Sequence, residues 1–115
     1  MKFQHKTLSQ GRWNNLSLMA QMANVGSEVS RSINWRQKGK KDLSNNSLFR
    51  SLELLFLTIN DPKNKNRLKE ITRVHELLVD DFLNGNTYAS KDSLWQNYFL
   101  GFAIASKLSS NKPSE

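Results

Sequence analysis

Residues 48–59, LFRSLELLFLTI, are the most apolar stretch of the chain and decide the expected fold. At about 100° per residue, most of its apolar side chains fall on one broad helical face, as in the central helix of a bundle. That face consists of Leu48, Phe49, Leu52, Leu55, Phe56 and Ile59. Leu54 and Leu57 lie outside it and form a second, narrower apolar strip. The stretch is therefore expected to contact neighbours on two sides, within the chain or in a partner subunit.

The composition favours one small helical domain. The chain has 115 residues, enough to bury a core, and its five Gly and two Pro leave few turns for a strand-rich fold. It has no cysteine, which excludes disulfides, thiolate catalysis and Cys-ligated metals. No run approaches the roughly 20 apolar residues of a membrane span, and residues 1–10 lack the apolar stretch of a secretory signal. We therefore expect a cytoplasmic protein that does not enter the membrane.

Apolar periodicity and capping residues predict four helices, at about residues 12–34, 44–60, 62–84 and 91–108. Pro62 directly after Asp61 is the usual start of a helix, and Gly39 and Gly85 are suited to helix C-termini. Because the connections are short, the sequence predicts an all-α, antiparallel four-helix bundle in up-down-up-down order over residues 11–108. Residues 1–10 are expected to form a flexible arm, and residues 109–115 a disordered tail.

Two mid-helix glycines predict close contacts between helices. A glycine inside a helix costs about 1 kcal/mol relative to alanine, so it needs a compensating reason. Gly26 lies on the apolar face of the first helix, and Gly101 lies beside Ala105 in the last one, whose inner face is expected to run from Leu94 to Leu108. Apolar residues left over from the main faces predict oligomerisation. These candidate interface residues are Leu54, Leu57, Leu77 and Leu100.

Basic charge is concentrated in one third of the chain. Residues 1–41 contain eight basic residues and one acid, which accounts for the whole net charge of +7, whereas the remainder has nine of each. An uneven distribution of this kind favours polyanionic partners.

Residues 35–41, WRQKGKK, combine an aromatic side chain with four basic ones, as proteins that grip single-stranded nucleic acid do. The alternative is a solvated loop in which Trp35 folds onto the core and the helix dipole favours the basic residues. A second basic group opens the third helix, at the opposite end of the expected bundle. The candidate nucleic-acid-binding residues are Arg31, Trp35, Arg36, Lys38, Lys40, Lys41, Lys63, Lys65 and Arg67.

No pattern of residues indicates catalysis. His75 lies on the apolar face of the third helix, and we expect a core histidine that is hydrogen-bonded across the bundle, for example to Asn97. The acidic residues Glu76, Asp80 and Asp81 have no second acidic helix to complete a metal site. We expect no enzyme activity, no cofactor and no metal.

The strings QMANVGSEVSRSINW, FRSLELLFLTINDP, RLKEITRVHELLVDDFL and YFLGFAIASK resemble a family of small prokaryotic helical proteins without an established activity, over nearly the whole chain. In shape and charge the chain is also similar to the four-helix-bundle accessory subunits of diversity-generating retroelements, which are basic, oligomeric and bind nucleic acid. This second likeness is architectural.

The sequence thus leaves two main functional hypotheses. The first is a basic, non-catalytic accessory protein that binds RNA or DNA within a larger complex and forms homo-oligomers. The alternative is a protein interaction module, antitoxin-like or an assembly subunit, that binds no nucleic acid.

Overall fold

The computed structural model describes residues 10–83 and 89–110, and every regular element in those two ranges is a helix. The elements are α1 (Gln10–Asn14), α2 (Leu18–Gln37), α3 (Lys41–Ile59), the 3-10 helix η1 (Pro62–Arg67), α4 (Leu68–Leu83) and α5 (Ala89–Ser110). The predicted all-α class is confirmed. None of the described helices is long and apolar enough to cross a membrane. Apart from residues 10, 109 and 110, the predicted arm and tail lie outside the described residues, as does Gly85.

Two predicted helices are each divided in the structure. The first breaks into α1 and α2 because Ser17 caps α2: its extended backbone lets its side-chain oxygen accept from the Ala20 N–H at 3.1 Å. The third begins as η1 and becomes α-helical only at Leu68. Its predicted start is confirmed, since Asp61 accepts from the Lys63 N–H at 3.1 Å with proline at the first position.

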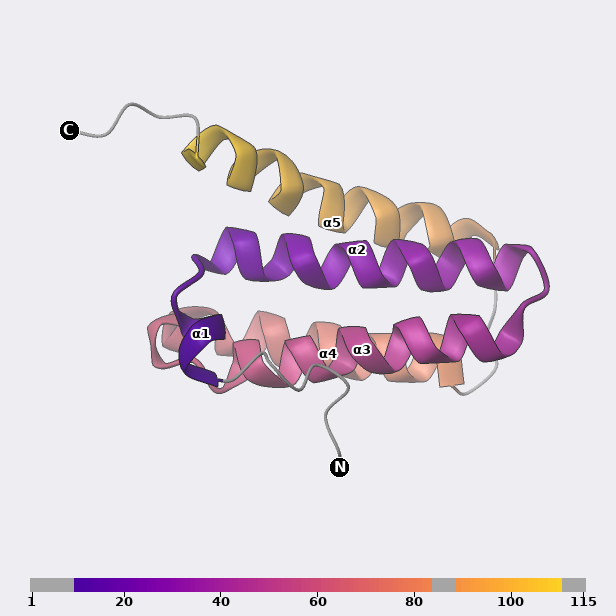
Figure 1. Cartoon of the computed structure of the whole chain (residues 1–115), viewed down its shortest axis with the longest axis horizontal. Coiled ribbons are helices and arrows are strands. Elements are labelled where there is room, and N and C mark those ends of the chain that lie inside the picture. Colours follow the sequence, from indigo (N-terminus) through magenta and orange to yellow (C-terminus); the bar gives the residue numbers. More distant parts are fainter. Residues whose placement is uncertain (1–9, 84–88, 111–115) are drawn as a thin grey trace.

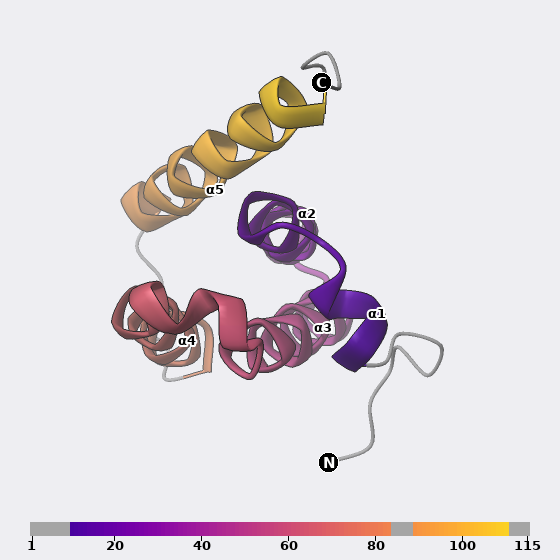
Figure 2. The ribbon, with the colours of Figure 1, turned by 90° about the vertical axis from the view of Figure 1, so that its left-hand side faces the viewer.

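The four long helices alternate in direction (Figure 1). α2 is the central one: it packs along α3 on one side and α5 on the other, while α4 packs against α3. In the view along the helices, α4 and α5 lie on the same side of the molecule, and α1 lies beside α3 (Figure 2). However, the backbones of α4 and α5 come close to each other at few points, if any, among the described residues. The closed up-down-up-down bundle therefore stays a prediction, because one of its four neighbouring pairs is open.

The contact between α2 and α3 is built from small polar side chains. The Ser44 hydroxyl donates to the Ser32 carbonyl at 2.8 Å, and the Ser32 hydroxyl donates to the Ser44 carbonyl at 2.9 Å. Ser47 and Ser51, which follow at helical spacing, are fully buried. Serines of this kind take up little volume, so the two backbones can lie close together.

Because these serines face inward, the buried face of α3 differs from the predicted one. Leu54 and Leu57 were predicted as oligomer-interface residues, but they belong to the core, with 4% and 6% of their surface exposed. The second apolar strip therefore meets neighbours within the chain, which was the other alternative. Conversely, Phe49 and Phe56 were expected inside and are 39% and 47% exposed. The pattern was misread because it counted the buried serines as outward-facing polar residues.

Gly26 lies where α5 crosses α2, which confirms the predicted close approach. A Cβ added at Gly26 would lie 2.6 Å from the Phe99 Cβ, a distance that side chains essentially never reach. Phe99 is buried there and packs edge-on against Tyr98, with ring centroids 5.1 Å apart. Phe99 of α5 is therefore seated directly on a glycine of α2, which brings the two helices close together at this point.

A buried polar network closes the end of the molecule near α1 and η1. The Gln21 side-chain amide donates to Asp61 at 2.8 Å and to the Trp13 carbonyl at 3.0 Å. The Asn64 amide donates to the Gln21 side-chain oxygen at 2.9 Å, and the Trp13 indole N–H donates to the Thr58 hydroxyl at 2.9 Å. These bonds satisfy buried polar groups and fix α1 and η1 against the ends of α2 and α3.

Candidate nucleic-acid interface and apolar surfaces

The turn between α2 and α3 presents the predicted basic segment. Gly39 has a φ of +74°, the left-handed conformation that favours glycine at a helix C-terminus, so its predicted capping role is confirmed. The Lys40 N–H donates back to the Trp35 carbonyl at 2.9 Å, which closes the turn. As a result, Lys38, Lys40 and Lys41 are all exposed on one tight bend.

Trp35 lies half-buried beside these lysines, and the Lys38 ammonium lies 5.4 Å from the centre of its ring. None of the three lysines forms an ion pair with a carboxylate in the part of the chain that the structure describes. No side chain caps the first turn of α3, where Lys40 occupies the N-cap position. A hollow of about 420 Å³ at this point is lined by Gly39, Lys40, Lys41, Asp42 and Leu43.

Four other predicted binding residues are engaged within the protein. Arg31 pairs with Glu28 at 3.0 Å, and Arg67 pairs with Glu70 at 2.7 Å. Lys63 pairs with the capping residue Asp61, and Arg36 pairs with Asp92.

Arg36 has a clear structural role, because it holds the first turn of α5 against the end of α2. Its guanidinium also lies 4.0 Å from the centre of the Phe82 ring on α4. Lys65 is exposed, but it lies on η1 at the opposite end of the molecule from the turn (Figure 1). The structure therefore gathers Trp35, Lys38, Lys40 and Lys41 into one place and separates them from the basic residues of η1.

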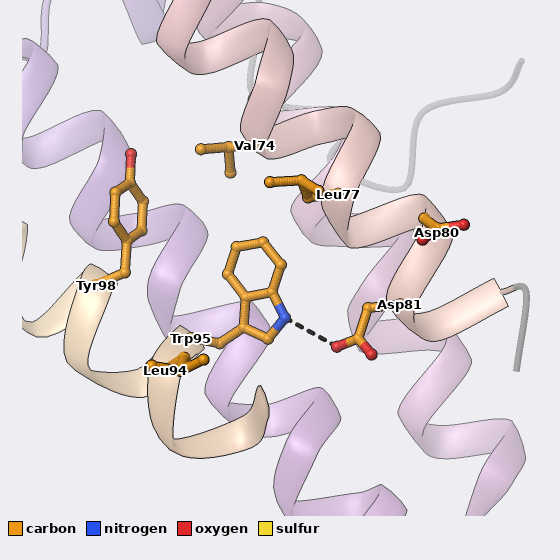
Figure 3. A pocket seen from close by; sticks show the side chains of 7 residues that line it. All are labelled: Val74, Leu77, Asp80, Asp81, Leu94, Trp95 and Tyr98. Carbon is orange, nitrogen blue, oxygen red and sulfur yellow. Dashed lines mark hydrogen bonds between the residues drawn. The ribbon is translucent and has the colours of Figure 1, made fainter. Parts of the chain in front are cut away.

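An apolar groove with a volume of about 320 Å³ lies along the open seam between α4 and α5 (Figure 3). It is lined by Val74, Leu77, Asp80, Asp81, Leu94, Trp95 and Tyr98. The Trp95 indole N–H donates to Asp81 at 2.9 Å, and the Tyr98 hydroxyl donates to Glu70 at 2.8 Å. The two helices are thus joined across the seam by the polar tips of long side chains, while the space between them is incompletely filled.

The seam also shifts the ionisation of two groups. Burial and the neighbouring Glu70 carboxylate raise the pKa of the Tyr98 hydroxyl far above its ordinary value, so this group remains a hydrogen-bond donor. Partial burial acts to raise the pKa of Glu70, but the hydrogen bonds from Arg67 and Tyr98 outweigh it, and the net pKa is lowered. Glu70 is therefore ionised at neutral pH and anchors Tyr98.

Apolar side chains are concentrated on the outward face of α5. Leu94, Leu100, Ile104 and Leu108 are 67%, 54%, 51% and 62% exposed. Leu94 and Leu108 were expected to face inward, and that prediction is wrong because α5 packs on α2 through Phe99 and Phe102 instead. Of the predicted interface residues, Leu77 and Leu100 are exposed, at 40% and 54%, and their role in an interface stays a prediction.

His75 is half-buried on α4, whereas its expected partner Asn97 is exposed on α5 and forms no hydrogen bond with it. Among residues 10–83 and 89–110, no three His, Asp or Glu side chains lie close enough together to hold a metal ion.

No family model, curated protein or solved structure matches this chain. The fold and its surfaces define an all-α protein with a basic turn at one end and an apolar helix face that no described residue covers.

Proposed function

We propose that this protein binds nucleic acid through the turn between α2 and α3, as a non-catalytic accessory protein. The observation that carries the proposal is the position of Lys38, Lys40 and Lys41. All three are exposed on one bend beside Trp35, and no described carboxylate neutralises them. The three arginines among the predicted binding residues are already paired with acidic side chains. We therefore limit the proposed binding site to the lysines of the turn and Trp35.

The expected chemistry is neutralisation of phosphates with one stacked base. Three lysine–phosphate contacts on a single strand give a slope of about −2 for the logarithm of affinity against the logarithm of salt. A fourfold increase in salt should therefore weaken binding about 20-fold. A base stacked on Trp35 adds roughly 1–3 kcal/mol on a single strand, and a base inside a duplex is not available for it.

Fluorescence anisotropy of labelled single-stranded RNA and duplex DNA, at about 50 and 200 mM salt, tests this proposal. The variant Lys38→Glu/Lys40→Glu/Lys41→Glu should lose binding. Its matched control is Lys65→Glu/Lys69→Glu/Arg73→Glu, which changes the net charge equally on exposed residues of η1 and α4 and should retain most of the affinity. Equal loss in both variants would mean that overall charge, rather than the turn, attracts the ligand.

The variant Trp35→Ala separates the contribution of base stacking from that of phosphate neutralisation. It should weaken binding of single-stranded RNA by about tenfold or more and leave duplex DNA nearly unchanged. No binding at the lower salt concentration would contradict the proposed function itself.

A second candidate function, a protein interaction module without nucleic-acid binding, is favoured by a different observation. The α4–α5 groove and the outward face of α5 expose a continuous set of apolar side chains, beyond the single exposed residues of an ordinary surface. This candidate stands if nucleic acid does not bind and substitutions on α5 change the association of the protein.

A further inference from the structure

The outward face of α5 has the spacing of a helix-pairing seam. Leu94, Asn97, Gly101, Ile104 and Leu108 follow one another at alternating intervals of three and four residues, the spacing that places side chains in one stripe along a helix. All five residues are exposed. The structure therefore contains a complete seam of about four helical turns with nothing packed on it by the described residues.

The helix-pairing seam on the outward face of α5 is uncharged. Between Asp92 and Lys107, α5 contains no Asp, Glu, Lys or Arg. Asp92 itself is buried and paired with Arg36. A strongly acidic or basic partner helix would find no opposite charge here, whereas a second copy of the same stripe matches it in character.

Gly101 lies in the middle of the seam and leaves room for a close approach. A Cβ added at Gly101 would meet nothing within 4 Å, so no contact inside the described part of the chain requires this glycine. Its cost to helix stability, about 1 kcal/mol, is therefore not offset by packing against the described residues. A second helix crossing at this point would provide the offset.

We propose that two copies of this chain pair through α5 in an antiparallel, two-fold dimer that crosses near Gly101. In that arrangement Leu94 of one copy packs against Ile104 and Leu108 of the other, and the two Leu100 side chains lie beside the crossing. The antiparallel orientation separates the two Lys107 side chains, which a parallel pair would place side by side at an energetic cost. This proposal goes beyond nucleic-acid binding and uses none of the residues of the basic turn.

The exposed area indicates a weak, concentration-dependent dimer. The three apolar side chains of the seam, together with the neighbouring Leu100, expose roughly 400 Å² per copy, about half of what each partner buries in an interface of standard size. Dissociation constants of about 1–100 μM are expected for such an interface. Because each copy carries a charge of +7, screening by salt should strengthen the dimer.

The dimer also has a consequence for the basic turn. Arg36, at the end of α2, is bound to Asp92 in the first turns of α5, so the turn lies near the N-terminal end of α5. An antiparallel pair places the two turns at opposite ends of the assembly. Two basic turns on one particle would bind a long strand more tightly than one.

Sedimentation equilibrium from about 5 to 500 μM protein tests the dimer over the range where half-occupation is expected. Wild-type protein should change from monomer to dimer, more readily at high salt. Ile104→Glu and Gly101→Leu should each weaken association by about 30-fold or more, because each places charge or bulk in the seam. The control Phe49→Glu removes an equally apolar, 39% exposed side chain from α3 and should leave association unchanged.

Cross-linking fixes the orientation, since the natural chain has no cysteine. Gly101→Cys should form a disulfide-linked dimer under oxidising conditions, and Leu108→Cys should not, because the two copies of residue 108 are far apart in the antiparallel pair. Circular dichroism confirms that each variant is folded. A monomer at every concentration, an effect of Phe49→Glu equal to that of Ile104→Glu, or efficient cross-linking through Leu108→Cys would overturn the proposal.

Discussion

The inner face of α5 packs on a glycine of α2, whereas the outward face of α5 contains a glycine of its own. Gly26 of α2 lies directly beneath Phe99 of α5, where an added Cβ would be 2.6 Å away from the aromatic side chain. Gly101 lies on the outward face of α5, where an added Cβ meets nothing within 4 Å. Both glycines predict a close approach from sequence alone, but only the first approach is made within the described part of the chain. The comparison shows that a mid-helix glycine indicates proximity without telling which molecule provides the neighbour.

The largest difference between the faces is expected from two adjacent residues. Phe99→Ala should lower the free energy of unfolding by about 3–5 kcal/mol, because Phe99 is 4% exposed and fills the α2–α5 contact. Leu100→Ala should cost less than about 1 kcal/mol in the monomer, since Leu100 is 54% exposed. Urea denaturation at low protein concentration measures both, and similar values would mean that the outward face is not open.

The second prediction concerns Asp61, in the buried polar network near α1 and η1. Asp61 is 4% exposed and accepts hydrogen bonds from Gln21 and Lys63. Burial acts to raise its pKa, but these hydrogen bonds and the Lys63 charge outweigh it, and the net pKa falls below the ordinary 3.8. Asp61→Asn should lower the free energy of unfolding at pH 7 by about 2 kcal/mol, because it disrupts charge-assisted bonds.

The pH dependence of this effect has a definite sign. A carboxyl group with a lowered pKa stabilises the folded state fully above its ordinary value, and the stabilisation is lost as pH falls through the folded pKa. The difference between wild type and Asp61→Asn should therefore be constant above about pH 5 and shrink below about pH 3.8. A difference that stays constant down to pH 2 would show that Asp61 contributes through packing alone.

Substitutions in the gap between α4 and α5 should change the free energy of unfolding less. Tyr98→Phe removes the hydrogen bond between the Tyr98 hydroxyl and Glu70, one of the few polar links between α4 and α5, and should cost about 1 kcal/mol. The pKa of Glu70 should rise toward its ordinary value of 4.5, because one of the two donors that lower it is lost. Carboxyl chemical shifts followed through an NMR titration measure this directly. An unchanged pKa would mean that Arg67 alone holds Glu70 ionised.

The sequence predicted the helical class, the role of Gly26 and the basic turn, because these depend on local periodicity, capping and composition. It assigned Leu54 and Leu57 to an oligomer interface, and Phe49 and Phe56 to the core, because the inner face of α3 includes serines whose burial depends on a neighbouring helix. The internal engagement of Arg36 could not be predicted either, since its partner Asp92 is 56 positions away. Leu94 and Leu108 were assigned to the wrong side of α5 for the same reason: periodicity defines a stripe, and tertiary packing decides which part of it is covered.

The most direct test of the comparison is the free energy of unfolding of Gly26→Ala and Gly101→Ala, measured at protein concentrations low enough to keep the chain monomeric. The same substitution should have opposite effects. Gly26→Ala should destabilise the protein by about 1–3 kcal/mol through its clash with Phe99, whereas Gly101→Ala should stabilise it by up to about 1 kcal/mol through better helix propensity. Destabilisation by both substitutions would contradict the account, because it would show that Gly101 is already packed against part of its own chain.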